Sequence, residues 1–437
     1  MFLRTRQHDD KVLVTSENAR WMLITKEEQE EISHDRISPK LHKKLEENKL
    51  IMTENNSQAI LADMKEKNGM LLQNPTLHII VPTTRCNLNC IYCHSMPCEK
   101  QDMDKETARK TIDFILSSPA KTMTIEFQGG EPLLNFEIVR YIIEQAKQKK
   151  DIRFDLVTNL TRMTEEIAQY LMENDISICT SLDGPKDLHD KNRPGSYDLT
   201  IKWIDYFRNK GYPINAGLVI TRNSLGRGKD IVDEYIRQGL RWIKLRPADP
   251  TGKALSDKQA VPDAEEYITF WKETIDYLLE MNKRTFLPDR HTYFLLTKLY
   301  QIQAYYSELA SPCGAIIGQL AYNPDGTISC CDEARIHELF TIGNVSQPFK
   351  EVVTSEKSCS IISASLNDTL LCDACAFKPF CGVCPVCTYA KTGSLVPILS
   401  QDDRCRILQA QFTHLIDLLQ TDKKEILEDW LKRTKHF

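Results

Sequence analysis

Three closely spaced cysteines are the first feature of this sequence that points to chemistry. Cys86, Cys90 and Cys93 lie in the stretch TTRCNLNCIYCHS with the spacing C-x3-C-x2-C. A C-x2-C pair suits zinc or iron, but zinc normally takes its second ligand pair from well downstream. Three thiolates on one loop can instead hold three irons of a [4Fe-4S] cluster. The fourth iron is then open to a ligand that chelates through amino and carboxylate groups.

Length and charge limit the class of protein. The chain has 437 residues, which predicts two or three domains, and a formal net charge of −5, which argues against nucleic acid as a partner. No apolar run is long enough to span a membrane, and the first residues, MFLRTRQHDDK, contain no apolar signal core. We therefore expect a cytoplasmic protein without a membrane partner.

The fifteen cysteines fall into two separate fields. Four lie between residues 86 and 98, one lies at 179, and the other ten lie between 313 and 405. Because the cytosol keeps thiols reduced, cysteines there are expected to be metal ligands or redox groups before disulfides. Two fields predict two metal-binding regions.

Residues 1–72 are expected to form a small, winged-helix-like strand–helix module. Residues 11–25 predict two strands around a polar turn, and residues 26–33 predict a charged helix. A second helix follows, with Ser38 as its cap and Pro39 at its first position. Such a module is either a packing appendage or a peptide-docking unit with an exposed sheet edge.

Residues 73–260 alternate between strand and helix patterns. The strand segments are LHIIVPTT, MTIEFQGG, FDLVTNL, ISICTSLDG, NAGLVITRN and WIKLRPAD. This alternation predicts an α/β fold with a parallel sheet closed fully or partly into a barrel, and ligands in such folds bind at the carboxyl ends of the strands. A helical connector over 261–308 and a cysteine-rich domain with a C-terminal helix over 309–437 are expected to follow.

The motifs at these strand ends resemble the radical S-adenosylmethionine (SAM) superfamily. The cysteine triad, with Tyr92 before its third cysteine, follows the first predicted strand, where that family has it. The turn QGGEP resembles the family's turn for the amino group of SAM, TN and SLDG resemble its groups for the ribose and sulfonium region, and KLRP resembles its backbone contact with adenine. Five features in the family's order weigh more than any one turn. The resemblance implies a partial (β/α)6 barrel and these SAM-binding residues: Tyr92, Gln128, Gly129, Gly130, Glu131, Thr158, Asn159, Ser181, Asp183 and Leu245.

The second cysteine field resembles the SPASM extension of radical SAM enzymes, which binds two auxiliary [4Fe-4S] clusters. Cys313, Gly326 and Cys331 have the family's spacing, and CDACAFKPFCGVC supplies the next four cysteines. The resemblance implies that the first auxiliary cluster is bound by Cys313, Cys331 and Cys384, and the second by Cys372, Cys375, Cys381 and Cys405. The last spacing in CDACAFKPFCGVC is one residue short, so Cys387 and Cys330 are alternative ligands. A pair of structural zinc sites is the competing interpretation.

The resemblance implies three clusters and a redox reaction. A reduced cluster cleaves SAM, and the 5′-deoxyadenosyl radical takes a hydrogen from the substrate; an auxiliary cluster accepts the remaining electron. An external electron donor, such as flavodoxin or ferredoxin, is expected. Asp332, directly after Cys331, is the candidate general base, and its alternative role is a helix cap or surface carboxylate.

Longer stretches suggest a substrate class. CTSLDGPKDLHDKNRPG, GRGKDIVDEYIRQGLRWIKLRP and CGVCP resemble the radical SAM maturases of His-Xaa-Ser peptide systems and related enzymes that modify ribosomal peptides. This resemblance implies a precursor peptide as partner and an oxidative side-chain crosslink as product. Two alternatives remain: an anaerobic sulfatase-maturase-like enzyme that forms formylglycine, and a non-catalytic Fe–S or zinc scaffold.

Overall fold

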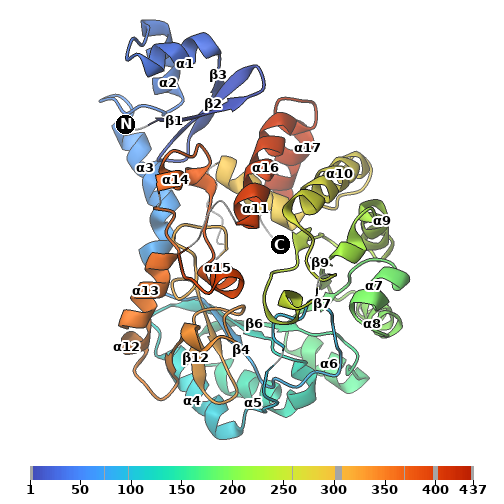
Figure 1. Cartoon of the computed structure of the whole chain (residues 1–437). Coiled ribbons are helices and arrows are strands. Elements are labelled where there is room, and N and C mark those ends of the chain that lie inside the picture. The colour runs from blue at the N-terminus through green and yellow to red at the C-terminus, as the bar shows by residue number, and fades with distance from the viewer. Residues whose placement is uncertain are drawn as a thin grey trace.

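The computed structural model describes residues 3–72, 74–96, 98–257, 259–300, 308–368, 370–396 and 402–434. Figure 1 shows the N-terminal strands and helices at one end of the molecule and a sheet covered by helices at the other. Late helices of the chain lie beside the N-terminal strands, and the His8 side chain contacts that of Asp417 at 2.6 Å. Within the described residues, no helix is long and apolar enough to cross a bilayer.

The N-terminal module is an antiparallel sheet followed by helices. Its elements are β1 (Leu3–His8), β2 (Lys11–Ser16), β3 (Trp21–Ile24), α1 (Lys26–Ser33), α2 (Pro39–Glu47) and α3 (Ser57–Asn68). Ser38 caps α2 as expected, because its hydroxyl accepts a hydrogen bond from the Leu41 N–H at 3.3 Å. Strand β1 and helix α3 were not predicted from the sequence.

The two faces of this sheet pack against different parts of the protein. On one face, Val12, Val14 and Ile24 form a small core with Leu41 and Leu45 of α2. The other face meets the C-terminal half of the chain, since side chains alternate between the two faces of a strand. There the Arg4 Nε–H donates to the Asp373 carbonyl and the Thr15 hydroxyl donates to the Ala376 carbonyl, both at 2.7 Å. The module is therefore anchored to the cysteine-rich region.

The barrel sheet contains five parallel strands in sequential order. They are β4 (Leu77–Ile80), β5 (Thr122–Phe127), β6 (Asp151–Val157), β7 (Ser177–Ser181) and β8 (Ile214–Gly217), and β9 (Val219–Ile220) pairs in parallel with β10 (Arg246–Pro247). The helices between them are α4 (Lys105–Leu116), α5 (Phe136–Ala146), α6 (Glu165–Glu173), α7 (Lys186–Asn192), α8 (Tyr197–Asn209) and α9 (Gly228–Arg237). This confirms the predicted α/β partial barrel.

Strand β5 shows how the sequence builds a polar interior. Met123, Ile125 and Phe127 are buried in the main hydrophobic core with apolar residues of the surrounding helices. The alternate residues Thr124 and Glu126 line a cavity inside the barrel. The alternation of side chains along β5 thus gives this strand an apolar outer face and a polar face toward the inside of the barrel.

The C-terminal region extends the barrel sheet. After α10 (Ala264–Asn282) and α11 (Arg290–Leu299), strand β11 (Gln319–Tyr322) pairs in parallel with β4, and β12 (Thr327–Ser329) and β13 (Thr341–Asn344) follow in antiparallel order. The helices beyond are α12 (Phe349–Val353), α13 (Glu356–Ala364), α14 (Leu370–Asp373), α15 (Pro385–Thr392), α16 (Asp403–Leu418) and α17 (Lys424–Arg433). One eight-stranded sheet therefore joins the expected barrel and the expected cysteine-rich domain. Residues 301–307 of the expected connector lie outside the described part of the chain.

Candidate active site

The first three cysteines lie together on the loop after β4. Burial raises the pKa of Cys86 to about 11, and the nearby thiols of Cys90 and Cys93 raise it as well. The Leu88 N–H lies 3.4 Å from the Cys86 sulfur, and an Arg193 N–H lies 3.8 Å from the Cys90 sulfur. N–H donors aimed at sulfur stabilise a thiolate, so this donor set fits an iron–sulfur cluster bound through three cysteines.

A single-ion site is not formed by these groups. Across the described residues, no three His, Cys, Asp or Glu side chains converge closely enough to hold one metal ion. Each thiolate of a four-iron cluster binds a different iron, so such a cluster does not require its ligands to meet at one point.

The QGGEP turn packs directly on the cysteine loop. The Gly130 N–H donates to the Thr83 carbonyl at 3.0 Å, and the Glu131 N–H donates to the Arg85 carbonyl at 2.8 Å. A Cβ atom on Gly130 would collide with the Arg85 carbonyl, and Gly129 has a φ of +132°, which L side chains rarely adopt. The two glycines therefore let two backbone segments touch at the strand ends.

Glu131 forms hydrogen bonds with the residues that follow β6. One oxygen of its carboxylate accepts a hydrogen bond from the Thr158 hydroxyl at 2.7 Å, and the other accepts one from the Asn159 N–H at 2.8 Å. The Asn159 side-chain amide in turn lies 3.2 Å from the Asn87 side-chain oxygen. Residues that follow β4, β5 and β6 are thus joined in one network, which includes the predicted Glu131, Thr158 and Asn159, and both Glu131 oxygens are engaged inside the protein.

A second network centres on Asp183, whose side chain is fully buried. The Tyr92 hydroxyl donates to Asp183 Oδ2 at 2.7 Å, and the Arg193 Nε–H approaches the same oxygen at 3.3 Å. The Arg193 guanidinium also lies 5.1 Å from the centre of the Tyr92 ring. The sequence analysis missed Arg193, although it stands within the quoted stretch CTSLDGPKDLHDKNRPG.

Two further predicted SAM residues, Ser181 and Leu245, differ in exposure. Ser181 lines the cavity. Leu245 is buried, and its backbone groups are engaged: its N–H donates to Asp289 Oδ1 at 2.8 Å, and its carbonyl accepts from the Tyr267 hydroxyl at 2.7 Å. Its neighbours Lys244 and Arg246 line the cavity.

The cavity has a volume of about 1560 Å³, and residues of the N-terminal module, the barrel and the cysteine-rich region line it. Its wall includes Tyr92 and Gln128 from the SAM-side strand ends, and Asp332 from the cysteine-rich region. It also includes Glu17 and Asn18, which lie in the turn between β2 and β3 of the N-terminal module. A substrate in this cavity can therefore contact the module, the barrel and the C-terminal region at once.

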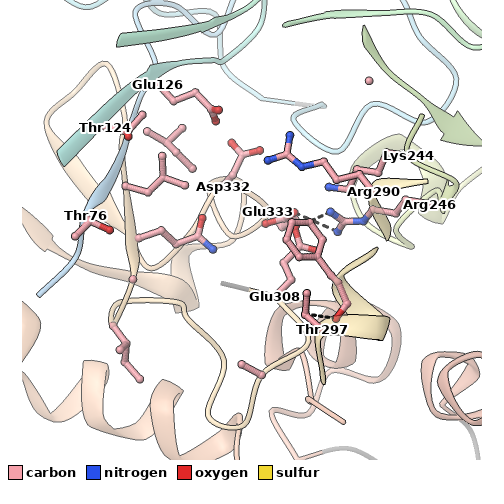
Figure 2. A pocket seen from close by; sticks show the side chains of 18 of the residues that line it. Thr76, Thr124, Glu126, Lys244, Arg246, Arg290, Thr297, Glu308, Asp332 and Glu333 are labelled. Atoms are coloured by element: carbon pink, nitrogen blue, oxygen red, sulfur yellow. Dashed lines mark hydrogen bonds and ion pairs between the residues drawn. The ribbon is translucent and has the colours of Figure 1, made fainter. Parts of the chain in front are cut away.

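Figure 2 shows the charged part of this wall, with Glu126 and Asp332 pointing into the cavity from different segments. Arg246 forms ion pairs with Glu308 at 2.7 Å and Glu333 at 3.3 Å, which the same view marks. Because both carboxylates are paired, this side of the cavity is held by a charge network that links the end of the barrel to the cysteine-rich region.

Asp332, the predicted base, is also held in ion pairs. Its carboxylate lies 2.7 Å from Arg335 Nε and 3.1 Å from His94 Nε2. Burial opposes its ionisation, but Arg335 and His94 together hold the pKa of Asp332 well below its usual range. The structure thus places Asp332 at the cavity, paired with an arginine and a histidine.

The thiols proposed for the first auxiliary cluster lie near one another. Burial and the thiol of Cys384 raise the pKa of Cys313. The Cys384 sulfur caps the N-terminus of α15 and accepts from the Cys387 N–H at 3.5 Å. Cys330 and Cys331 interact directly. The alternative ligands Cys330 and Cys387 therefore lie next to the thiols proposed for the first auxiliary cluster.

The thiols proposed for the second auxiliary cluster form a separate group. Burial raises the pKa of Cys381 to about 12, and Cys405, Cys372 and Cys375 act in the same direction. The Gln409 side-chain amide donates to the Cys405 sulfur at 3.1 Å. Four mutually close thiols from two helices and a loop fit a cluster with four cysteine ligands.

Comparison with known proteins agrees with this architecture. The model of the Radical SAM superfamily matches residues 80–235. The cysteine-type anaerobic sulfatase-maturating enzyme of Clostridium novyi is 23% identical over 319 residues, which is 68% of this chain and 84% of that protein.

Two solved structures share the fold. The structure of native anSMEcpe with bound AdoMet and Cp18Cys peptide has a TM-score of 0.70 and 21% identity, and covers 80% of this chain and 100% of that one. The structure of Streptococcus suis SuiB bound to the precursor peptide SuiA has a TM-score of 0.60 and 14% identity, and covers 92% of this chain and 98% of that one.

Residues 80–235 match the radical SAM superfamily, so the protein is a radical SAM enzyme, and a cysteine-rich C-terminal region follows its barrel. Membership implies SAM and a [4Fe-4S] cluster. The three mutually close thiols and the glycine turn packed against their loop fit that pair of groups.

Proposed function

We propose that this enzyme oxidises a side chain of a ribosomally made precursor peptide and installs a side-chain crosslink. The observation that carries the proposal is the single cavity lined by the SAM-side strand ends, the cysteine-rich region and the turn of the N-terminal module. A small-molecule substrate does not need contacts of this extent. A peptide substrate is bound at the residue that reacts and also at residues distant from it.

In this proposal the first cysteine loop and the strand ends form the SAM site. Cys86, Cys90 and Cys93 hold the cluster, and the backbone at Gly129 and Gly130 approaches the amino end of SAM. Bound there, the cluster and SAM supply hydrogen-atom abstraction from the substrate. Tyr92, Glu131, Thr158, Asn159 and Asp183 position SAM through the two hydrogen-bond networks. Gln128, Ser181 and Leu245 complete the predicted SAM site.

The N-terminal module is proposed to dock the precursor peptide. β3 is an edge strand of its sheet, pairing only with β2 within the described residues, and an edge strand can accept an added peptide strand. The turn that leads into β3 lines the cavity at Asn18 and Ala19. A peptide paired with β3 would therefore start next to the cavity entrance, which raises its local concentration there.

The cysteine-rich region is proposed to carry the electron released by the substrate. Cys313, Cys331 and Cys384 would hold one auxiliary cluster close to Asp332, and the four cysteines grouped around Cys381 would hold another. External electron donors, such as flavodoxin or ferredoxin, would reduce the first cluster.

A second candidate function is formylglycine formation on a sulfatase. The similarity to the Clostridium novyi sulfatase-maturating enzyme favours it, because it spans 68% of this chain. About a fifth of this chain, however, has no counterpart in the anSMEcpe structure, whereas SuiB covers 92% of it. The larger shared extent with SuiB favours a precursor peptide.

The test is anaerobic co-expression with short reading frames beside the gene, followed by mass measurement of each peptide. The proposal predicts a peptide that loses two hydrogens only when the intact enzyme is present. A variant with Cys86, Cys90 and Cys93 changed to Ala is the matched control. Conversion of Cys or Ser to formylglycine in a sulfatase-derived peptide, with every neighbouring short peptide unchanged, would instead establish the second candidate.

A further inference from the structure

The cavity contains a carboxylate that the family motifs do not explain. Glu126 lies on β5, two residues before Gln128, and lines the cavity below the SAM-side strand ends. Side chains two residues apart on a strand point the same way and are about 7 Å apart along it. The Gln128 side-chain amide donates to the Glu126 carboxylate, so Glu126 is tied to the QGGEP turn.

We propose that Glu126 is the residue that accepts the proton lost by the substrate, an inference that rests on the proposed function. One hydrogen leaves the substrate as an atom and ends in the 5′-deoxyadenosine formed from SAM. The second leaves as a proton to the Glu126 carboxylate, and its electron passes to an auxiliary iron–sulfur cluster. The substrate thereby loses two hydrogens and gains one bond, which balances atoms and electrons.

The partners of the two acids facing the cavity favour Glu126 over Asp332 for this role. Both Asp332 oxygens lie in ion pairs, with Arg335 and with His94. Among the residues that the structure describes, the Glu126 carboxylate accepts one hydrogen bond, from the neutral amide of Gln128, and forms no ion pair. The ion pairs stabilise the charged form of Asp332 and make it a weaker base than a carboxylate bound by a neutral amide. Figure 2 shows the Glu126 carboxylate pointing into the open part of the cavity.

The surroundings of Glu126 also suit proton uptake near neutral pH. Burial raises the pKa of Glu126 to about 7; Asp155 and Asp332 act in the same direction, while Gln128 and Lys244 oppose them. Cys179 on the facing part of β7 also interacts with Glu126. A general base works best when its pKa lies near the working pH.

The experiment compares Glu126→Gln with Asp155→Asn, which removes a neighbouring cavity carboxylate on β6. Each reconstituted variant is incubated with SAM, reductant and the peptide that the wild-type enzyme modifies. Glu126→Gln should still release 5′-deoxyadenosine but should form at least tenfold less modified peptide per 5′-deoxyadenosine, and Asp155→Asn should stay within about threefold of wild type. Equal product from Glu126→Gln and wild type, or an equal loss in both variants, would overturn the inference. Failure of the wild type to modify any peptide would instead reject the proposed function.

Two further measurements test the inference without requiring the Glu126→Gln variant to modify the peptide. In the wild-type enzyme, modified peptide per 5′-deoxyadenosine should fall as pH drops below about 7, and a ratio that is flat between about pH 6 and about pH 8 would contradict the inference. In the metal-free protein, a raised pKa means that the folded state binds the proton more tightly. Stability contributed by protonated Glu126 is then lost as pH rises from 4.5 to about 7. Glu126→Gln should remove that loss, and an unchanged pH dependence of unfolding would count against the buried-base assignment.

Discussion

His94 Nε2 lies 3.1 Å from Asp332 Oδ2, which joins the loop of the first cysteine triad to the loop of the second cysteine field. His94 directly follows Cys93, and Asp332 directly follows Cys331. Arg335 completes the contact, because it pairs with Asp332 and also donates to the Ser95 hydroxyl at 2.8 Å. The two metal-binding regions expected from the sequence are therefore held together by charged side chains next to their ligands.

This contact predicts a structural effect of Asp332→Asn. The Arg335 side chain is only 5% exposed, so removing its carboxylate partner leaves a buried charge unpaired and should destabilise the metal-free protein by about 3 kcal/mol. Denaturant unfolding under reducing conditions measures this, with the exposed Glu338→Gln as the matched control. A variant of unchanged stability that has lost peptide product would favour the catalytic role predicted for Asp332 from the sequence.

The three cysteine groups predict separable metal content. Three clusters give about twelve irons per chain, and changing Cys86, Cys90 and Cys93 to Ala should lower this by about four. Such a variant should form no 5′-deoxyadenosine but keep the absorbance of the auxiliary clusters. The exposed Cys359→Ala should keep all the iron, because Cys359 lies outside the three groups. Zinc in place of iron in the C-terminal region would show that those sites are structural.

Contacts of the N-terminal module predict an effect on the second auxiliary group. Thr15→Val removes the hydroxyl that bonds the Ala376 carbonyl, which follows Cys375, and should loosen that loop by about 1 kcal/mol. In the metal-free protein, Cys372 and Cys375 should then be alkylated about fivefold faster, with no change at Cys86.

The matched control for Thr15→Val is Thr5→Val, on β1. Thr5 pairs with Val14, whose side chain belongs to the module's own core and not to the face that meets the cysteine-rich region. Equal alkylation rates in Thr15→Val and wild type would show that the module does not support this loop. Unchanged rates in the control are required in either case.

A buried histidine predicts an acid sensitivity. His78 on β4 has no exposed surface and contacts the Tyr322 hydroxyl at 2.7 Å, and burial lowers the pKa of His78 from 6.5 to about 3. The folded state then keeps His78 neutral while the unfolded chain binds a proton, so stability is lost as pH falls from 6.5 towards 3. His78→Asn should lessen this slope by roughly 1.4 kcal/mol per pH unit. An equal slope in wild type and variant, measured by denaturant unfolding, would contradict the assignment; exposed His42→Asn is the control.

The parts of the fold that the sequence predicted have strong local patterns. The apolar strands of the barrel end in motifs with glycine, asparagine or cysteine, and β2, β3 and the cap at Ser38 follow ordinary strand and helix rules. Strand β1 was missed because its sequence, LRTRQH, is mostly charged and polar and has no apolar alternation. Its polar side chains contact another part of the chain, as Arg4 does at the Asp373 carbonyl. Helix α3 was missed because Ile60 is its single buried residue among those described, which leaves almost no helical period to detect.

The parts of the site that were missed depend on tertiary contacts. Arg193 reaches Asp183 and Cys90 from the end of α7, and Arg335 reaches Ser95 on a loop far away in the sequence. No local spacing encodes such pairs. Glu126 is predictable as a cavity-facing residue from the alternation of β5, but its setting depends on neighbouring strands. The joining of β11 to β4 was likewise invisible, because four-residue strands carry little pattern.

The central claim is that a peptide side chain gives up a hydrogen atom at the SAM site formed by the cysteine triad and the strand ends. Transfer of deuterium from a labelled peptide into 5′-deoxyadenosine tests this most directly. The peptide from the co-expression experiment is prepared with deuterium at the carbons of its modified residues and incubated anaerobically with the reconstituted enzyme, SAM and reductant. We predict deuterium in 5′-deoxyadenosine and one modified peptide for each 5′-deoxyadenosine formed. Modified peptide with 5′-deoxyadenosine free of deuterium at every labelled position would contradict the account.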